Sequence, residues 1–437
     1  MLNFEFMRFI YLIFLCAVFS AATYAQEILT VEEAVNIALK NNFDILVARN
    51  DADIAKVNNT PGNAGMLPSV DITGSGNYKN NNVFQKLSGG IENKYPSLST
   101  TSVNAGAELS WTLFDGGKMF VTKNKLNEIQ SLGEIQFKDR VLQTLYSVIS
   151  AYYEVVRQKQ QLTSINEVMN LNRERVIIAQ AGYNAGSLLK TDLLQAKIDL
   201  NVTMENAINQ QFAIDAAKKN LNVLLGKEPS IAIEVSDSIP LNYIPDRNAF
   251  VQRLDSVNTS ILVLQKQKQI AQLNLKENQR LYSPVLNLNG GYFLTQTINS
   301  DGSVLNSRSF GPQIGGSLII PLYSAGENRR KITTAKIQLQ SAEYDLNNVK
   351  LQVNTELENA LTGFENQRQL MLIEKDNKAL AKENFEISLS RLRLGQTTSL
   401  EVHQAQENYV QSSTRLINFE YNLKIAETKL KQLIAAL

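Results

Sequence analysis

Two stretches of this sequence are too long and too uninterrupted to form anything but very long helices. From about residue 118 to 181 there is no proline and one glycine, and the same holds from 327 to 394. At 1.5 Å per residue, each helix would run on the order of 100 Å. Apolar residues recur along both at spacings of three, four and seven, which is the seam of a coiled coil. Helices of this length require antiparallel partners of similar length rather than a globular core.

The two stretches belong to two copies of one pattern. The segment Ser110–Gly117 leads into the first long helix, and Ile319–Gly326 leads into the second, 209 positions later (110 to 319). The same shift relates Gly186 to Gly395, Asp192 to Glu401, and Gln195-Ala196 to Gln404-Ala405. Each copy contains an opening helix, two alternating segments around a polar loop, the long helix, a glycine-marked turn and a returning helix. We therefore interpret the chain as a tandem duplication.

The duplication divides the chain into four parts. We predict a signal peptide at 1–25, a first repeat at 26–226, a linker at 227–246 and a second repeat at 247–437. In the first repeat the hairpin covers about 67–114 and the helical tip about 182–187. In the second repeat they cover about 284–322 and 394–397.

The alternating segments predict β-strands with one apolar and one polar face. In Val103–Leu113 every odd position is apolar and every even position is polar or glycine, and segments near 69–78, 286–292 and 313–322 alternate similarly. Strands of about ten residues with this pattern are typical of outer-membrane barrels. The alternative is an ordinary soluble hairpin packed on the helices. The polar loops 79–102 and 295–309 would face the exterior, and five aromatic residues would suit the membrane interfaces. These are Tyr78, Trp111, Phe114, Tyr292 and Tyr323.

Four strands cannot close a membrane barrel alone. Closed barrels need about eight strands or more, since an open sheet edge in lipid leaves backbone groups unsatisfied. If the hairpins insert in a membrane, several chains must therefore pool their strands. Together, the long helices and the four short strands predict a fold class that is mainly α with a small β part.

The start of the chain and its composition point to export. Arg8, the apolar run Phe9–Phe19 and the small residues before Gln26 form a secretory signal with cleavage expected after Ala25. The only cysteine, Cys16, follows a leucine rather than the small residue that precedes a lipidated cysteine, so no lipid-attachment motif is apparent. Forty-three basic and 42 acidic residues nearly cancel, which argues against nucleic acid as a partner.

Nothing in the sequence predicts an enzyme, a metal or a cofactor. The only histidine, His403, has no cysteine or second histidine with which to share a metal, and we expect it on a solvated helix face. There is no phosphate-binding glycine loop and no nucleophile elbow. Two function classes remain, a passive transport duct and a periplasmic coiled-coil scaffold protein of the cell envelope.

Several short motifs, in the same order in both copies, resemble those of the TolC-like outer membrane efflux proteins over essentially the whole mature chain. The residues that carry the resemblance are Leu29–Ala34, Leu67–Val70, Leu113–Gly117, Tyr183–Gly186 and Thr191–Leu193. The resemblance implies a homotrimer with a 12-strand β-barrel in the outer membrane above a barrel of helices in the periplasm. It also implies a periplasmic adaptor protein and an inner-membrane pump of the RND, ABC or MFS class as partners. The duct would serve a tripartite efflux system or a type I secretion system.

The resemblance further implies a periplasmic aperture at the helical tips. Glu401 matches the first acidic position of the family's constriction, Gln404 replaces the second, and Asp192 with Thr191 matches the first tip. Two family lock residues are replaced by Leu392 and Thr397, and Arg391 or Arg393 could substitute for them. Adaptor contacts are expected at Gly182, Gly186, Leu188, Leu394 and Gly395. The alternatives are that the carboxylates are solvated helix-start residues, and that the leucines are the last layers of coil packing.

Overall fold

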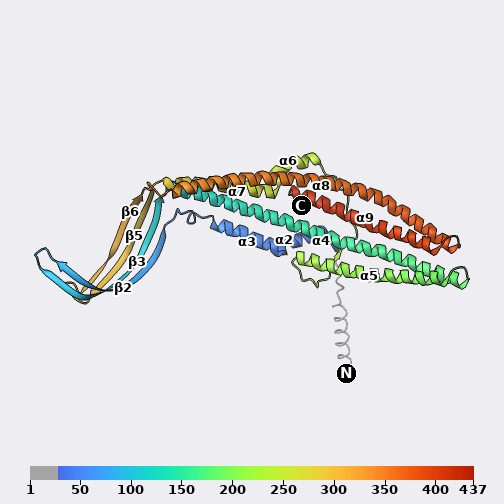
Figure 1. The fold of residues 1–437 in the computed structure, drawn as a ribbon, viewed down its shortest axis with the longest axis horizontal. Helices are drawn as coiled ribbons and strands as arrows, with labels where there is room; N and C mark the ends of the chain where they lie inside the picture. The colour runs from blue at the N-terminus through green and yellow to red at the C-terminus, as the bar shows by residue number, and fades with distance from the viewer. Residues whose placement is uncertain (1–27) are drawn as a thin grey trace, which may run out of the picture. The chain divides into compact units, whose positions relative to one another are not determined.

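The computed structural model describes residues 28–437 (Figure 1). The predicted signal peptide, 1–25, lies outside them. The described chain forms two compact units. Unit 1 comprises 28–47, Asp139–Asn258 and Val353–Leu437, and unit 2 comprises Ala48–Lys138 and Thr259–Gln352. The described residues include no helix with both the length and the apolarity needed to cross a membrane.

The helices confirm the tandem duplication residue by residue. The long helices α4 (Lys118–Asn184) and α8 (Glu327–Arg393) each have 67 residues. The returning helices α5 (Lys190–Leu224) and α9 (Ser399–Leu433) each have 35. Both bounds of each pair differ by 209, as the sequence motifs do (118 to 327, 190 to 399).

The opening helices repeat too, at a slightly larger shift. The first copy begins with α2 (Val31–Asn41) and α3 (Phe43–Asn58). The second begins with α6 (Arg247–Val257) and α7 (Thr259–Gln279), followed by a 3₁₀ turn, η1 (Arg280–Tyr282). Thr30 and Glu33 form the capping box of α2, with each side chain bonded to the other residue's backbone N–H.

A buried asparagine joins each opening helix pair to the end of its returning helix. Asn42 separates α2 from α3, and its Nδ2 donates to the Leu224 carbonyl at 2.7 Å. Asn258 separates α6 from α7, and its Nδ2 donates to the Leu433 carbonyl at 3.0 Å. Each bond satisfies a carbonyl in the last turn of a helix, where no intrahelical partner is available. The duplication therefore extends from motifs to single hydrogen bonds.

The sheet of unit 2 has four antiparallel strands in the order β2-β3-β5-β6. They are β2 (Ser69–Lys86), β3 (Glu92–Phe114), β5 (Val285–Asn299) and β6 (Asn306–Ile319). The central β3–β5 pairing joins the two copies, and β2 and β6 are the outer strands. The prediction of four strands is confirmed, but the predicted loop at 79–102 is wrong. Most of it is strand, because the backbone of β2 and β3 stays paired as far as Lys86 and Glu92.

The register places the alternating residues on common faces. One row across the sheet consists of Ile72, Ala107, Tyr292 and Pro312, and its neighbour consists of Asp71, Glu108, Gly291 and Gln313. Successive side chains of a strand point to opposite faces. The side chains of the first row therefore form an apolar stripe on one face of the sheet. Those of the second row form a largely polar stripe on the opposite face.

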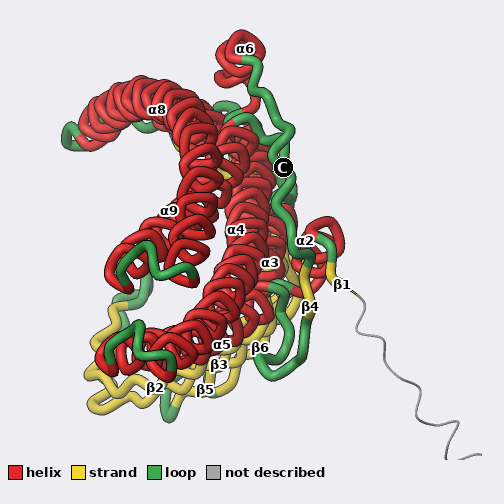
Figure 2. The backbone as a smooth tube through the Cα atoms, turned by 90° about the vertical axis from the view of Figure 1, so that its right-hand side faces the viewer, coloured by secondary structure: helices red, strands yellow, loops and turns green. Residues whose placement is uncertain are grey.

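In unit 1 the four long helical segments lie side by side in the order α8, α9, α4, α5 (Figures 1 and 2). One core cluster joins α2, α4, α5 and the linker around Val148, Tyr152 and Leu221. A second joins α4, α8 and α9 around Val168, Phe385 and Tyr409. The outer helices of this layer are α5 and α8.

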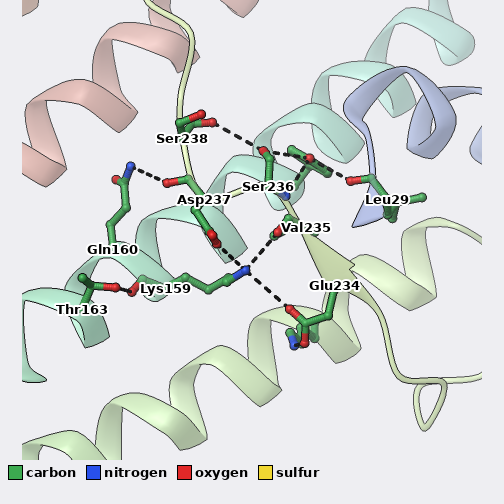
Figure 3. Close-up of polar contacts among 11 residues, drawn as sticks. Leu29, Lys159, Gln160, Thr163, Glu234, Val235, Ser236, Asp237 and Ser238 are labelled. Carbon is green, nitrogen blue, oxygen red and sulfur yellow. Dashed lines mark hydrogen bonds and ion pairs between the residues drawn. The ribbon is translucent and has the colours of Figure 1, made fainter. Parts of the chain in front are cut away.

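The linker is fixed to α4 by the network in Figure 3, which we call the belt. Strand β4 (Glu234–Val235) pairs in parallel with β1 (Ile28–Leu29). The buried Tyr152 hydroxyl donates to the Leu29 carbonyl at 2.9 Å and lies 3.1 Å from Ser236 Oγ. Lys159 Nζ donates to the Val235 carbonyl at 2.9 Å and forms ion pairs with Glu234 and Asp237. The predicted linker is therefore an ordered part of unit 1.

Candidate aperture at the helical tips

The tips of the two hairpins are tight turns that require glycine. Gly186 has φ +74° after α4, and Gly395 has φ +69° after α8. This left-handed backbone region is disfavoured for residues with a Cβ. The turns are closed by backbone bonds from Gly186 to the Tyr183 carbonyl and from Gly395 to the Leu392 carbonyl. Glycine at these positions allows each long helix to reverse direction within a few residues.

Gly182 is needed for a different reason. A Cβ at this position would lie 2.6 Å from Leu188 Cδ1, so the leucine packs directly over the bare Cα. Leu188 also contacts the small cluster of Ala179, Leu193 and Ala196. Leu188 is therefore part of the packing of the first tip. Leu394, by contrast, is 70% exposed.

Three of the predicted aperture residues, Thr191, Asp192 and Glu401, lie in the first turns of the returning helices, and Gln404 lies in the second turn of α9. Asp192 Oδ2 accepts a bond from the Leu189 N–H at 3.1 Å, while Thr191 is exposed. Glu401 N–H donates to the Thr398 hydroxyl at 3.3 Å, and its carboxylate contacts the Thr397 hydroxyl. Gln404 is exposed and reaches only Asn408. Among the described residues of one chain, no hydrogen bond joins the first-tip pair to the second-tip pair.

A buried charged link inside unit 1 was not predicted from the sequence. Arg175 of α4 is 1% exposed and Asp199 of α5 is 9% exposed. Arg175 Nη1 lies 2.6 Å from Asp199 Oδ2, and Arg175 Nη2 donates to Ser399 Oγ of α9 at 3.0 Å. A buried ion pair requires this kind of close, hydrogen-bonded geometry to offset its desolvation. The Arg175 link therefore ties the two hairpins together about three helical turns above the first tip.

His403, which we expected on a solvated helix face, is partly exposed. Its side chain is 37% exposed, and its Nδ1 is 3.3 Å from Asp199 Oδ2, beside the Arg175 link. The side chain lines a cavity of about 490 Å³ between α4, α5 and α9. The closeness of α5 to α9 at this level is a contact that no local sequence pattern encodes.

The residues that replace the family's lock have separate roles. Leu392 is buried in the cluster with Phe385 and Leu389, and the Thr397 hydroxyl contacts the Glu401 carboxylate. Of the two candidate arginines, Arg393 forms an ion pair with Glu174 of α4. Arg391 instead donates to the Gln396 carbonyl of its own turn at 3.0 Å. Of Arg391 and Arg393, it is therefore Arg393 that connects the two hairpins.

The two tips share a groove of about 390 Å³. Gly182 and Leu188 line it from the first tip, and Leu392, Arg393 and Gly395 line it from the second. Gly186 and Leu394 are not among its lining residues. The structure thus brings three of the five predicted tip residues together in one surface feature.

The predicted interface aromatics lie at the sheet. Tyr78, Trp111, Phe114 and Tyr292 are on strands β2, β3 and β5, with exposures from 36% to 65%. Trp111 Nε1 donates to the Met66 carbonyl at 3.0 Å. Tyr323 does not lie on a strand, because β6 ends at Ile319 before the predicted bound of 322. Pro321, which has no N–H to donate to the sheet, follows that end.

The described residues contain no group of three or more histidine, cysteine, aspartate or glutamate side chains able to hold a metal ion. The features of the site are instead tight tips, helix-start carboxylates, a groove between the tips, and a four-stranded sheet with an apolar face.

Long paired helices, a hairpin in each of two copies and glycine-marked tips define the class of outer-membrane channel proteins with a helical extension. A family model described as outer membrane efflux protein matches residues 34–227 and 258–436, once in each copy. The chain therefore belongs to the outer membrane efflux protein family.

Relatives and solved structures agree with this family. The chain is 20% identical over 419 residues to the proteases secretion protein PrtF of Dickeya chrysanthemi, covering 94% of this chain and 88% of that one. It is 24% identical over 330 residues to the outer membrane efflux protein BepC of Brucella suis biovar 1, covering 75% and 70%. The fold matches the outer membrane protein VceC of Vibrio cholerae with a TM-score of 0.73 at 16% identity, covering 92% and 95%.

Family membership decides between the two function classes left open by the sequence. The chain is an outer-membrane export duct of the TolC-like type, and its localisation is the outer membrane with a helical part in the periplasm. The family consists of channel proteins. The periplasmic scaffold alternative is not supported.

Proposed function

We propose that three copies of this chain form one continuous duct, which passively conducts substrates from a periplasmic adaptor and an inner-membrane pump of the RND, ABC or MFS class to the exterior. The observation that carries the proposal is the four-stranded sheet, in which the outer strands β2 and β6 each have one edge that pairs with no other described strand. Three copies supply 12 strands (three times four). A closed sheet of this size satisfies every strand edge in the membrane.

The apolar face of the sheet supports its contact with outer-membrane lipid. Val70, Ile72, Ile314 and Leu318 share this face and are 62% to 89% exposed in the single chain. Exposed apolar surface of this extent marks an interaction site. Tyr78, Trp111, Phe114 and Tyr292 supply aromatic side chains for its two interfaces, and Tyr323 lies just beyond the end of β6.

The helical tips are the proposed periplasmic aperture. Threefold symmetry turns Glu401 into a ring of three carboxylates that attracts cations, with Asp192, Thr191 and Gln404 nearby in each copy. The groove lined by Gly182, Leu188 and Gly395 is the proposed adaptor contact, with Gly186 and Leu394 at its margin. Transport energy comes from the pump.

The duct is tested by separating inner and outer membranes, extracting the protein in mild detergent and measuring its native mass. We expect an outer-membrane species with the mass of three mature chains. A monomer or dimer free in the periplasm would overturn the proposal, because four strands cannot close a barrel.

The carboxylate ring is tested by single-channel recording in planar bilayers. We expect Glu401→Gln to lower cation selectivity and relieve block by divalent cations. Glu383→Gln on the exposed face of α8 removes the same charge away from the tips and serves as the control. Unchanged selectivity and block in Glu401→Gln would show that Glu401 is only a helix-start residue.

A further inference from the structure

The cavity beside His403 has no part in the proposed duct, and its size suits a small ligand. Its volume is about 490 Å³, and it lies between α4, α5 and α9, all within unit 1. Sites for small organic ligands have volumes of roughly 300–1,000 Å³ and mostly apolar walls with a few polar groups. We call this space the hairpin cavity, because α4 and α5 form the first helical hairpin and α9 belongs to the second.

Apolar side chains from all three helices form part of the cavity wall. They are Ile165 and Val168 of α4, Ile198 and Val202 of α5, and Val410 of α9. Val168 is 4% exposed, but Ile198 and Val202 are 53% and 48% exposed in the single chain. Burying apolar surface away from water is favourable. The wall therefore favours a ligand with an apolar body.

The charged groups of the wall favour a positive ligand. The described residues that line the cavity include two carboxylates, Asp199 and Glu407, and neither lysine nor arginine. Asp199 is already paired with Arg175. Glu407 is partly buried and forms no ion pair with any residue of 28–437. Because a charge that is removed from water is costly unless it is paired, Glu407 is the group that a cation would neutralise.

An unsatisfied acceptor lies at the preceding position of α9. Gln406 also lines the cavity and is 4% exposed, and its Oε1 accepts no hydrogen bond from any described residue. Buried polar atoms are nearly always hydrogen-bonded. An N–H group of a ligand in the cavity can supply the missing donor. Gln406 and Glu407 together therefore favour a ligand that carries both a positive charge and N–H groups.

We propose that the hairpin cavity binds an organic cation with an apolar body and N–H groups. The positive charge pairs with Glu407, an N–H donates to Gln406 Oε1, and the apolar body packs against the valine and isoleucine side chains of the wall. An apolar anion would meet two carboxylates with no lysine or arginine in the lining. An inorganic cation would leave the apolar wall exposed to water. Since one chain supplies the whole lining, binding does not depend on contacts between copies.

Ligand binding to the full-length protein in mild detergent tests the proposal. The probe is ethidium, a planar aromatic cation with amino groups, and its fluorescence anisotropy is measured against protein-free micelles as the blank. We expect saturable binding of one ethidium per chain. The apolar anion 1-anilinonaphthalene-8-sulfonate should not displace it.

Three variants locate the binding site. Glu407→Gln keeps the shape of the side chain but removes its charge, and we expect it to weaken ethidium binding about tenfold. Glu205→Gln is the matched control, because it removes the same charge from an exposed position of α5 that does not line the cavity. Val202→Phe places a larger side chain in the cavity and should abolish binding. Because Val202 is 48% exposed, we expect this variant to keep its native mass and helical circular dichroism.

Equal affinity in the unsubstituted protein and all three variants would overturn the proposed site. Loss of binding in Glu401→Gln but not in Glu407→Gln would also overturn it and assign the ethidium to the carboxylates at the tips. Displacement by the anion would overturn the preference for a cation. If Val202→Phe loses its native mass, the comparison of Glu407→Gln with Glu205→Gln decides alone.

Discussion

The belt and the tips of unit 1 are held by different kinds of contact. In the belt, Tyr152 and Lys159 of α4 bind backbone carbonyls of segments about 80 to 120 residues away in sequence. At the tips, Asp192 and Glu401 bond only within four residues of their own positions. Long-range buried contacts resist local opening, whereas short exposed turns open at little cost. The contacts therefore hold the belt more firmly than the tips.

The Arg175 link marks the boundary between these two regions. It is buried like the belt, yet it connects α4 and α5 to α9 close to the tips. If the two hairpins separate at the tips, the bond between Arg175 and Ser399 must break. If that bond holds, the two hairpins must move together. Of the contacts in these two regions, the Arg175 link is therefore the one whose loss should lower the free energy of unfolding most.

The largest effect is expected from Asp199→Asn. The substitution leaves the buried Arg175 guanidinium without its carboxylate, and removing one partner of a buried ion pair costs roughly 3–5 kcal/mol. Urea unfolding of the detergent-solubilised protein, followed by helical circular dichroism, measures this loss.

The matched control is Glu174→Gln, which breaks the more exposed Arg393–Glu174 pair. Exposed pairs contribute about 0–1 kcal/mol. Equal destabilisation by the two substitutions would show that the Arg175 link is no more important than a surface pair.

The next largest effect is expected from Tyr152→Phe in the belt. Without its hydroxyl, the Leu29 carbonyl loses its donor in a buried site, which costs about 1–3 kcal/mol. We expect faster amide hydrogen exchange in β1 and β4, with the exchange of the tip residues unchanged. Tyr183→Phe at the first tip is the control, because the Tyr183 hydroxyl has no hydrogen bond within residues 28–437. Faster exchange at the tips in Tyr152→Phe would mean that the belt and the tips open as one unit.

Much of the fold could be predicted because its signals are local and repeated. The long helices begin at Lys118 and Glu327 as predicted, and end within three residues of the expected positions, because glycine turns mark their ends. Strand lengths were underestimated for a physical reason. The polar residues between Lys79 and Ser102 carry no alternation, yet their backbones pair regardless of side-chain character.

The contacts between hairpins were less predictable than the hairpins themselves. Arg175, Asp199 and Ser399 are spread over three helices, and their meeting depends on how the helices rotate against one another. The closeness of His403 to Asp199 depends on the same rotation. The duplication did make one kind of contact predictable. Asn42 and Asn258 each end an opening helix, and they bond to the equivalent carbonyls of Leu224 and Leu433 in their own copies.

A smaller effect is expected from Gly395→Ala at the second tip. The backbone there has φ +69°, which costs an alanine about 1 kcal/mol. Gly363→Ala in the middle of α8 is the opposite case. No described atom beyond the chain neighbours and adjacent backbone turns of α8 lies within 4 Å of the added Cβ, and alanine favours the helix by up to about 1 kcal/mol. Thermal unfolding should therefore shift down in the first variant and up in the second. An unchanged or raised unfolding temperature in Gly395→Ala would mean that the tip turn is not strained by the substitution.

The smallest effect is the pH dependence of the belt. Burial raises the pKa of Glu234, but hydrogen bonds and charge from Lys218 and Lys159 outweigh it, so the pKa lies below the ordinary value of 4.5. A carboxyl with a depressed pKa stabilises the fold above its ordinary pKa, and this contribution is lost as the pH falls through the folded value. For Lys159, burial lowers the pKa, but Asp237 and Glu234 raise it above 10.5 overall, so its contribution is lost only in strong alkali.

The belt should therefore be at full strength between these limits and weaken in acid. Lys218→Gln removes one partner of Glu234 and should lower the unfolding temperature at neutral pH, by an effect of at most about 1 kcal/mol because the pair is partly exposed. The difference from the unsubstituted protein should shrink as the pH falls below 4.5. Lys219→Gln, an exposed neighbour, should show no such convergence. A difference that persists in acid would mean that Lys218 stabilises the belt through packing of its methylene chain rather than through the charge of Glu234.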